Sequence, residues 1–367
     1  MKTLRRLIYR EIVGSVAFVA LAFLSLFLFI DLVEELGRMA QRGRTLSQVL
    51  EAVALQLPGH VYELMPLAVL IGTIYVLARM AQTSEFTVLR TGGLAPGRML
   101  GLLAGVAAAF AVLTFVMGDF VAPRTERAAV LLEARGSPGL ALGRTGAWLK
   151  ERRMDPQGER TVSVNVGAAG SGGRLQGVRI FEFDTDSRLV RRIQAQRATV
   201  GEEGIWVLEE VQESLWPASG EAAVRTGRHA TLGWPSTLGP AVVAAAVLPP
   251  RTMNTLDLWR YSSHLSNQEQ ASQLYQIQFW KRAFYPFACF VMIALALPFA
   301  YLHGRSGGVS LKVFGGIMLG ISFVLVNNVF GHIGILRDWT PWVAALLPSL
   351  LYLGLSLAAF AWLVRYR

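Results

Sequence analysis

Residues 283–302 read AFYPFACFVMIALALPFAYL, a run without a single charged side chain. A helix needs about 20 apolar residues to cross the hydrocarbon core of a lipid bilayer, and this run has that length. Further uncharged runs of comparable length are residues 12–30, 99–118, 313–336 and 340–364. The sequence therefore predicts a membrane α-helical protein.

A sixth, shorter candidate span covers residues 64–78 and is bounded by Glu63 and Arg79. It reaches the thickness of a bilayer only if its helix begins near Val53 and carries Glu63 close to the interface. Pro66 would then kink this helix. With it, we expect six membrane-spanning helices, three before and three after a long insert.

The composition also favours membrane helices over a soluble fold. Hydrophobic residues make up 53% of the 367 residues, charged residues make up 16%, and the mean hydropathy is +0.42. Soluble domains carry about 25% charged residues because they need a polar surface. The net charge is +10, but many of the basic residues flank apolar runs rather than forming one groove, so we expect no nucleic-acid partner.

The short loops between the predicted spans are rich in lysine and arginine. These residues are Lys2, Arg5, Arg6 and Arg10 before the first span, Arg79, Arg90 and Arg98 around the loop after the second, Arg305 and Lys312 after the fourth, and Arg365 and Arg367 at the C-terminus. Because short basic loops stay in the cytoplasm, we expect both termini to be cytoplasmic and the insert to lie outside.

The insert has mixed charge and many glycines. Within it, TVSVNV at residues 161–166 alternates in the way of a half-buried strand. Similar segments, separated by turn residues, are 178–183, 190–200, 205–211 and 224–232. Several short strands with turn signals predict a sandwich or jellyroll. The predicted organisation is 1–122 with three spans, an all-β domain at 123–250, and 251–367 with three spans.

Candidate catalytic and metal-binding groups are sparse. The five histidines are scattered, and no two have the spacing of ligands on one helix face, so we expect no metal and no cofactor. Inside the predicted spans the polar groups are almost limited to Asn327, Asn328 and His332. A proton- or ion-coupled transporter would carry more ionisable groups there, so we expect another protein to supply the energy for any transport.

The loop after the second predicted span, residues 81–98, reads AQTSEFTVLRTGGLAPGR. Ser84 is a suitable N-cap, and Glu85 would lie beside the positive end of the helix dipole. Gly92 and Gly93 would end this short amphipathic helix. The residues that share one of its sides are Phe86, Leu89 and Arg90. Such a helix could lie on lipid headgroups or dock into a cytoplasmic ATPase, and the pattern alone does not separate the two.

Several segments resemble the lipopolysaccharide (LPS) export permeases of the LptF/LptG family. They are YELMPLAVLIG at 62–72, SEFTVLRTGGL at 84–94, GDFVAP at 118–123 and AQRATVGEEGIWVLEEV at 195–211. The resemblance covers essentially the whole chain, in order. The YEL-x-P form is more like the LptG than the LptF branch of the family.

The resemblance implies a subunit of an ABC transporter in the bacterial inner membrane, with a periplasmic β-jellyroll. It implies an LptF-type permease, LptC and a dimer of the ATPase LptB as partners, so that ATP is hydrolysed in LptB and not in this chain. The residues that would face LptB from the coupling helix, about 84–94, are Ser84, Glu85, Phe86, Leu89 and Arg90. The jellyroll would join those of LptF and LptC in a bridge toward the outer membrane.

The resemblance further implies an LPS cavity lined mainly by spans one, two and five. The span-five residues in question are Phe314, Ile317, Ile321, Val324 and Asn327. Near the outer end of span one, where the family pattern leads us to expect lysine, this chain has Asp31. We expect Arg38, at a nearby position, to take the basic role toward the phosphates of LPS.

Three alternatives remain open. The chain could be the LptF-type subunit of the same complex. It could be an ABC membrane protein of the mechanotransmission type, which moves periplasmic partners rather than lipid. It could also be a membrane-embedded lipid-modifying enzyme, although such an enzyme needs a cluster of carboxylates, histidines or a nucleophile at one depth, and the sequence contains no evident cluster of this kind.

Overall fold

The computed structural model describes residues 2–42, 45–85, 88, 96–135, 140–141, 146–155, 158–169, 174–201, 204–216, 223–239, 243, 249–267, 272–301 and 308–365. The chain divides into two compact units. Unit 1 comprises Met1–Leu36, Val53–Thr125 and Gln276–Arg367. Unit 2 comprises Gly37–Ala52 and Glu126–Tyr275.

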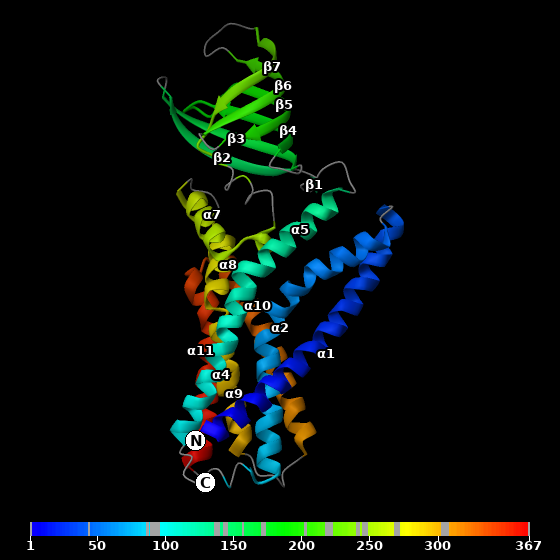
Figure 1. The fold of residues 1–367 in the computed structure, drawn as a ribbon. Coiled ribbons are helices and arrows are strands. Elements are labelled where there is room, and N and C mark those ends of the chain that lie inside the picture. Colours follow the sequence, from blue (N-terminus) through cyan, green and yellow to red (C-terminus); the bar gives the residue numbers. More distant parts are fainter. Residues whose placement is uncertain are drawn as a thin grey trace. The chain divides into compact units, whose positions relative to one another are not determined.

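Unit 1 is helical (Figure 1). Its helices, some of which extend into unit 2, are α1 (Lys2–Arg42), α2 (Leu46–Gln82), α4 (Pro96–Val116), the π-helical turn η1 (Met117–Val121), α8 (Gln273–Phe284), α9 (Phe287–Tyr301), α10 (Val309–Leu336) and α11 (Pro341–Arg365). Among the described residues, five helical segments are long and apolar enough to cross a membrane, and α8 with α9 supplies a sixth if this bent pair is one span. The predicted membrane helices are confirmed.

The fourth span was expected at residues 283–302. The structure has here a bent pair of helices, α8 and α9, which starts at Gln273 and bends by 55° at the break between them. Pro286 lies in this break and has no backbone N–H to continue the helical ladder. The chain restarts with a hydrogen bond from Ala288 N to the carbonyl of Tyr285 at 3.0 Å.

The second span, the shortest by sequence, is a continuous helix of 37 residues that runs through Pro58 and Pro66. In its most apolar stretch of 18 residues, 67% of the residues are buried, against 11% in the corresponding stretch of α1 and 22% in that of α10. Because other helices surround it, its surface need not match lipid, which explains its weak hydropathy signal. Close packing here depends on Gly72, whose Cβ, if present, would lie 2.7 Å from the backbone nitrogen of Val16 on α1.

Several helix ends that flank the basic loops lie at the same end of the helical unit. In Figure 1 the start of α1, the end of α2, the start of α4 and the end of α11 are at the same end of unit 1. The end of α9 and the start of α10 are at this end too. The described helix ends that flank the basic segments therefore share one side of the helical unit.

The described part of unit 2 contains a seven-stranded antiparallel sheet, with α5 (Ala122–Arg135), η3 (Pro250–Thr252) and α7 (Thr255–Asn267). Its strands are β1 (Leu140–Ala141), β2 (Ala147–Asp155), β3 (Gly158–Ala169), β4 (Arg174–Phe183), β5 (Leu189–Val200), β6 (Ile205–Leu215) and β7 (Arg225–Pro235). β3 to β7 pair in sequential order, and β1 and β2 both pair with β3. The inserted β domain is confirmed, with its described strands in one sheet rather than in two separate layers.

The sheet curls around a core of side chains from its inner face. Trp206 and Trp234 are fully buried there, edge to face with ring centroids 5.6 Å apart. The segment after β7 returns to β2, where the Glu151 carboxylate accepts hydrogen bonds from Ser236 Oγ at 2.6 Å and Thr237 N at 2.9 Å. These contacts join the two ends of the curved sheet.

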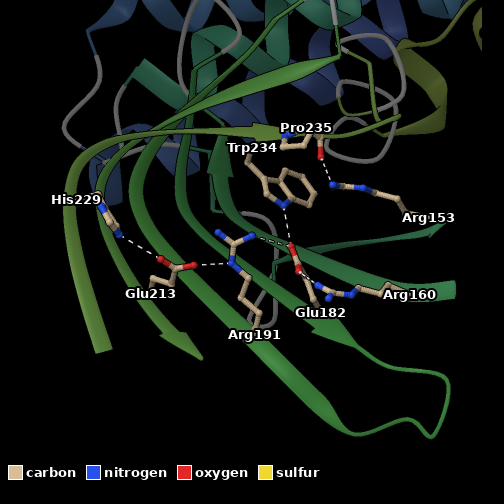
Figure 2. A network of polar contacts seen from close by, with 8 residues as sticks. All are labelled: Arg153, Arg160, Glu182, Arg191, Glu213, His229, Trp234 and Pro235. Carbon is tan, nitrogen blue, oxygen red and sulfur yellow. Dashed lines mark hydrogen bonds and ion pairs between the residues drawn. The ribbon is translucent and has the colours of Figure 1, made fainter. Parts of the chain in front are cut away.

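A charged row crosses the sheet from β3 to β7 (Figure 2). It consists of Arg160, Glu182, Arg191, Glu213 and His229. The Glu182 carboxylate, only 5% exposed, lies 3.4 Å from Arg160 and 3.6 Å from Arg191, and it accepts a hydrogen bond from the indole of Trp234 at 3.0 Å. Since its two carboxylates are matched by arginines, the row acts as a set of cross-strand pairs that hold neighbouring strands.

Candidate functional site

A groove of about 590 Å³ opens between α1, α2 and α10, which are spans one, two and five. Its described lining is Arg10, Glu11, Gly14, Ser15, Phe18, Val19, Ile71, Tyr75 and Val313. The α1 part of this lining falls within the first half of the helix, and the α2 part lies close to that helix's end. The groove therefore belongs to the half of the bundle that carries the basic connections.

An ion pair borders the groove at its charged end. Arg79 Nη2 lies 2.7 Å from Glu11 Oε2, and both side chains are more than a third exposed. Such a pair contributes little to stability, about 0.2–1 kcal/mol. Its position matters more than its strength, because Arg79 is in the last turn of α2, shortly before residues 84–94, the segment predicted to be a coupling helix.

The five residues proposed for span five follow one another along α10 at intervals of three or four, so they share a face. Phe314, Ile321 and Val324 are 57%, 42% and 42% exposed, and Ile317 and Asn327 are half-buried. They are not among the described residues that line the groove, although Val313 beside Phe314 is. The structure therefore places them along a largely uncovered apolar helix face.

One contact holds α8 against α10 near Asn327, the last of these five residues. Lys281 on α8 donates a hydrogen bond from Nζ to the backbone carbonyl of Asn327 at 2.9 Å. Gly331, one turn further along α10, leaves room for the Lys281 side chain, which a Cβ there would meet. Sequence reasoning missed this lysine because it lies before the uncharged run that marked the fourth span.

Asp31, at the position on span one where the family pattern led us to expect lysine, pairs with a histidine of α2. Asp31 Oδ2 lies 2.7 Å from Nε2 of His60 on α2, with side chains only 12% and 19% exposed. The ring of Phe27 lies against the His60 ring at 5.0 Å between centroids. His60, which the sequence did not single out, is thus the group facing Asp31. Arg38 is half-buried and belongs to unit 2.

Of residues 84–94, predicted to be a coupling helix, the structure describes Ser84, Glu85 and Val88. Ser84 and Glu85 are exposed, and the Ser84 carbonyl accepts a hydrogen bond from Val88 N at 3.1 Å, as at the start of a helix. The φ of Ser84 is 61°, in the left-handed region, whereas an N-cap normally has extended backbone. Phe86, Leu89 and Arg90 lie outside the described residues.

Two of the family-like segments meet in space. Tyr62, from YELMP on α2, packs on Gly118 of GDFVAP so closely that a Cβ at Gly118 would collide with its ring. Gly118 lies in the π-helical turn η1, a feature often found at functional sites. The Arg282 guanidinium lies 5.8 Å from the Tyr62 ring centroid.

The break in the fourth span completes this contact. Tyr285 lies at the break, with its ring 4.5 Å from that of Tyr62, and its hydroxyl donates to the Glu63 carbonyl at 2.6 Å. The segments thus join α2, the end of α4 and the bent span. Among the described residues, no group of three or more histidines, cysteines or carboxylates could hold a metal ion.

Comparison with known proteins agrees with this architecture. The model of the family described as "Lipopolysaccharide export system permease LptF/LptG" matches residues 6–364. The chain is 26% identical over 356 residues to the lipopolysaccharide export system permease protein LptG of Haemophilus influenzae, and 27% identical over 358 residues to that of Escherichia coli K12. Each alignment covers 96% of both chains.

Proposed function

Because this chain belongs to the LptF/LptG family of lipopolysaccharide export permeases, a family of multi-pass inner-membrane permease subunits without an ATPase of their own, we propose that it extracts LPS along the faces of α1 and α10. The observation that carries this proposal is their lack of burial. In the most apolar 18 residues of each helix, 11% of the residues of α1 and 22% of those of α10 are buried. These shares are lower than in the other described single-helix spans. Large apolar faces with this little cover require lipid or a partner against them.

The energetics of the cargo favour such a surface. Lipid A has about six acyl chains of about a dozen carbons, and exposing them to water costs about 0.8 kcal/mol per CH₂, or roughly 50 kcal/mol in all. No single nucleotide-driven step supplies that amount. The acyl chains must therefore pass from the bilayer to an apolar protein surface without becoming fully wet, and the face from Phe314 to Val324 suits this step.

We propose that ATP hydrolysis in an LptB dimer drives this extraction, and that LptB binds the coupling segment, about residues 84–94. The Arg79–Glu11 pair joins the end of α2 to α1, so a push on the coupling segment is passed to the first span. An LptF-type permease would supply the second half of the cavity, with LPS entering between span one of one subunit and span five of the other. The resemblance of the YEL-x-P segment and the LptG relatives favour the LptG role for this chain.

Photo-crosslinking tests the lipid path. A photoreactive amino acid at Phe314 or Ile321 should capture LPS in the assembled complex, and ATP should lower the yield as LPS is expelled. Leu355 on α11, 52% exposed, is the matched control on a helix outside the proposed path. Equal, ATP-independent capture at all three sites would mean that LPS is merely surrounding lipid, as expected of a mechanotransmission protein.

The orientation is tested separately. Cys289 is buried, so a single cysteine introduced at Glu85 can be labelled without background. We expect a membrane-impermeant maleimide to label a cysteine at Ser187, in an exposed turn before β5, from outside intact spheroplasts, and to label one at Glu85 only after permeabilisation. Labelling of Glu85→Cys from outside intact spheroplasts would show that the topology is inverted. The coupling segment could then not bind a cytoplasmic ATPase.

A further inference from the structure

We propose that an anionic phospholipid of the cytoplasmic leaflet binds at the first half of α1, with its headgroup on Arg5, Arg6 and Arg10 and one acyl chain in the groove toward Phe18. The site rests on the proposed orientation of the chain. It is distinct from the α10 face assigned to LPS, because none of the residues of that face is among the described residues that line the groove, to which α10 contributes Val313.

Two hollows meet at Arg10. One is the groove between α1, α2 and α10; the other, of about 580 Å³, is lined by Arg5, Arg6, Tyr9, Arg10 and Val13. Arg10 lines both. A basic hollow that opens beside an apolar groove has the two parts that a phospholipid requires, a headgroup site and a chain site.

The headgroup part is positioned by neighbouring helices. The Arg5 guanidinium lies 6.0 Å from the Tyr9 ring centroid. The Tyr9 hydroxyl in turn lies against Gly105 of α4, where an added Cβ would be only 2.6 Å away. Tyr9 is therefore held in place by close packing, and it presents Arg5 at the hollow through a cation–π contact.

The charge of the site is clearly positive. Glu11, the one carboxylate among the residues described as lining the two hollows, is engaged by Arg79 at 2.7 Å. Within the described part of the chain, neither Arg6 nor Arg10 makes an ion pair. Among the described lining residues, three guanidinium groups thus stand beside no unpaired carboxylate, which favours a phosphate with net negative charge.

Charge, rather than the groove, should decide which lipid binds. An acyl chain gains little by leaving hydrocarbon for an apolar groove, because both surroundings are equally apolar. A basic residue near an anionic headgroup is worth about 1 kcal/mol, or about fivefold in affinity. Phosphatidylglycerol should therefore be preferred over phosphatidylcholine by fivefold or more, and loss of Arg10 should cost about fivefold.

The experiment uses the assembled transporter in nanodiscs. A photoreactive phenylalanine derivative replaces Phe18, and the discs contain trace radiolabelled phosphatidylglycerol or phosphatidylcholine. Two variants address the site: Arg10→Gln removes a headgroup contact, and Gly14→Phe fills the groove, since nothing lies within 4 Å of the Gly14 Cβ position. Their matched controls are Arg365→Gln on α11 and Gly101→Phe on α4, which is equally open.

We expect phosphatidylglycerol to be captured at least fivefold more than phosphatidylcholine, about fivefold less in Arg10→Gln, and hardly at all in Gly14→Phe, with both controls near wild type. Equal capture of the two lipids, or equal losses in Arg10→Gln and Arg365→Gln, would overturn the proposal. Capture of a partner polypeptide, or displacement of phosphatidylglycerol by LPS, would also overturn it. LPS capture from Phe314 in the same discs reports on the export proposal independently.

Discussion

At the scale of single residues, the clearest constraint is the contact between Gly118 and Tyr62. Any side chain at Gly118 would collide with the Tyr62 ring, which is itself confined by Tyr285 and Arg282. Overpacking of a rigid site usually costs about 1–3 kcal/mol. This contact also gives a physical reason for the glycine in GDFVAP.

We therefore predict that Gly118→Ala lowers the thermal unfolding temperature of the detergent-purified complex by several degrees. Gly354→Ala on α11 is the matched control, since nothing lies within 4 Å of its Cβ position. Tryptophan fluorescence on heating measures both. An unchanged transition in Gly118→Ala would show that Tyr62 moves aside without cost.

His264 on α7 makes unit 2 sensitive to acid. Burial lowers the pKa of its imidazole from the ordinary 6.5, and the nearby Glu151 only partly opposes this shift. Its Nε2 is buried and has no hydrogen-bond partner in the described structure. Below pH 6.5 the unfolded state therefore takes up a proton that the folded state resists, so stability falls as the pH drops.

We predict that hydrogen exchange in α7 and β2 becomes faster between pH 7 and pH 5, after correction for the intrinsic rate. His264→Gln, which has no titrating group, should remove this extra pH dependence. His229, which is 43% exposed and paired with Glu213, provides the control substitution His229→Gln. A pH response that survives in His264→Gln would assign it to another group.

At the scale of elements, the coupling segment begins in an unusual backbone conformation. Ser84 has φ 61°, a region that costs a residue with a Cβ about 1–2 kcal/mol and costs glycine nothing. A β-branched residue fits this region worst. The way in which α2 leads into the coupling segment should therefore depend on residue 84.

We predict that Ser84→Gly retains LptB in the purified complex, whereas Ser84→Val loses a large part of it. Glu85→Ala should also weaken LptB binding, because it removes a carboxylate from the first turn. The ratio of LptB to permease after size-exclusion chromatography measures each effect. Full retention in both Ser84→Val and Glu85→Ala would contradict the docking role of this segment.

At the scale of the whole molecule, the Arg79–Glu11 pair is expected to link ATP-driven motion of the coupling segment to the first span. Exposed pairs contribute only about 0.2–1 kcal/mol to stability, so a substitution here should leave the protein folded. The effect should appear in the coupling between ATP hydrolysis and LPS release.

We predict that Glu11→Arg lowers LPS release per ATP hydrolysed in proteoliposomes, and that adding Arg79→Glu partly restores it. The control is the exposed pair Arg197–Glu210 in unit 2, 2.8 Å apart, where Glu210→Arg should leave the release ratio unchanged. If Glu11→Arg releases LPS as efficiently as the unaltered protein, the pair plays no part in coupling.

The sequence by itself determined the membrane helices, the inserted β domain and most strands. Several uncharged runs of about 20 residues are typical of helices in lipid, and strict alternation such as TVSVNV has one face to bury. It missed β2, AWLKERRMD, because Glu151 faces inward at a position where alternation calls for an apolar residue. The buried carboxylate accepts hydrogen bonds from Ser236 and Thr237, 85 and 86 residues away in the chain.

Only the tertiary structure decided which residues meet. It paired Asp31 with His60, set Tyr62 on Gly118, placed Lys281 against α10 and bent the fourth span at Pro286. Apart from the bend, which Pro286 marks, none of these contacts leaves a local pattern, because each joins groups that are far apart in the sequence and are brought together by the packing of helices. Local periodicity reports which face of an element is buried, whereas the partner on that face is chosen by the packing of the whole chain.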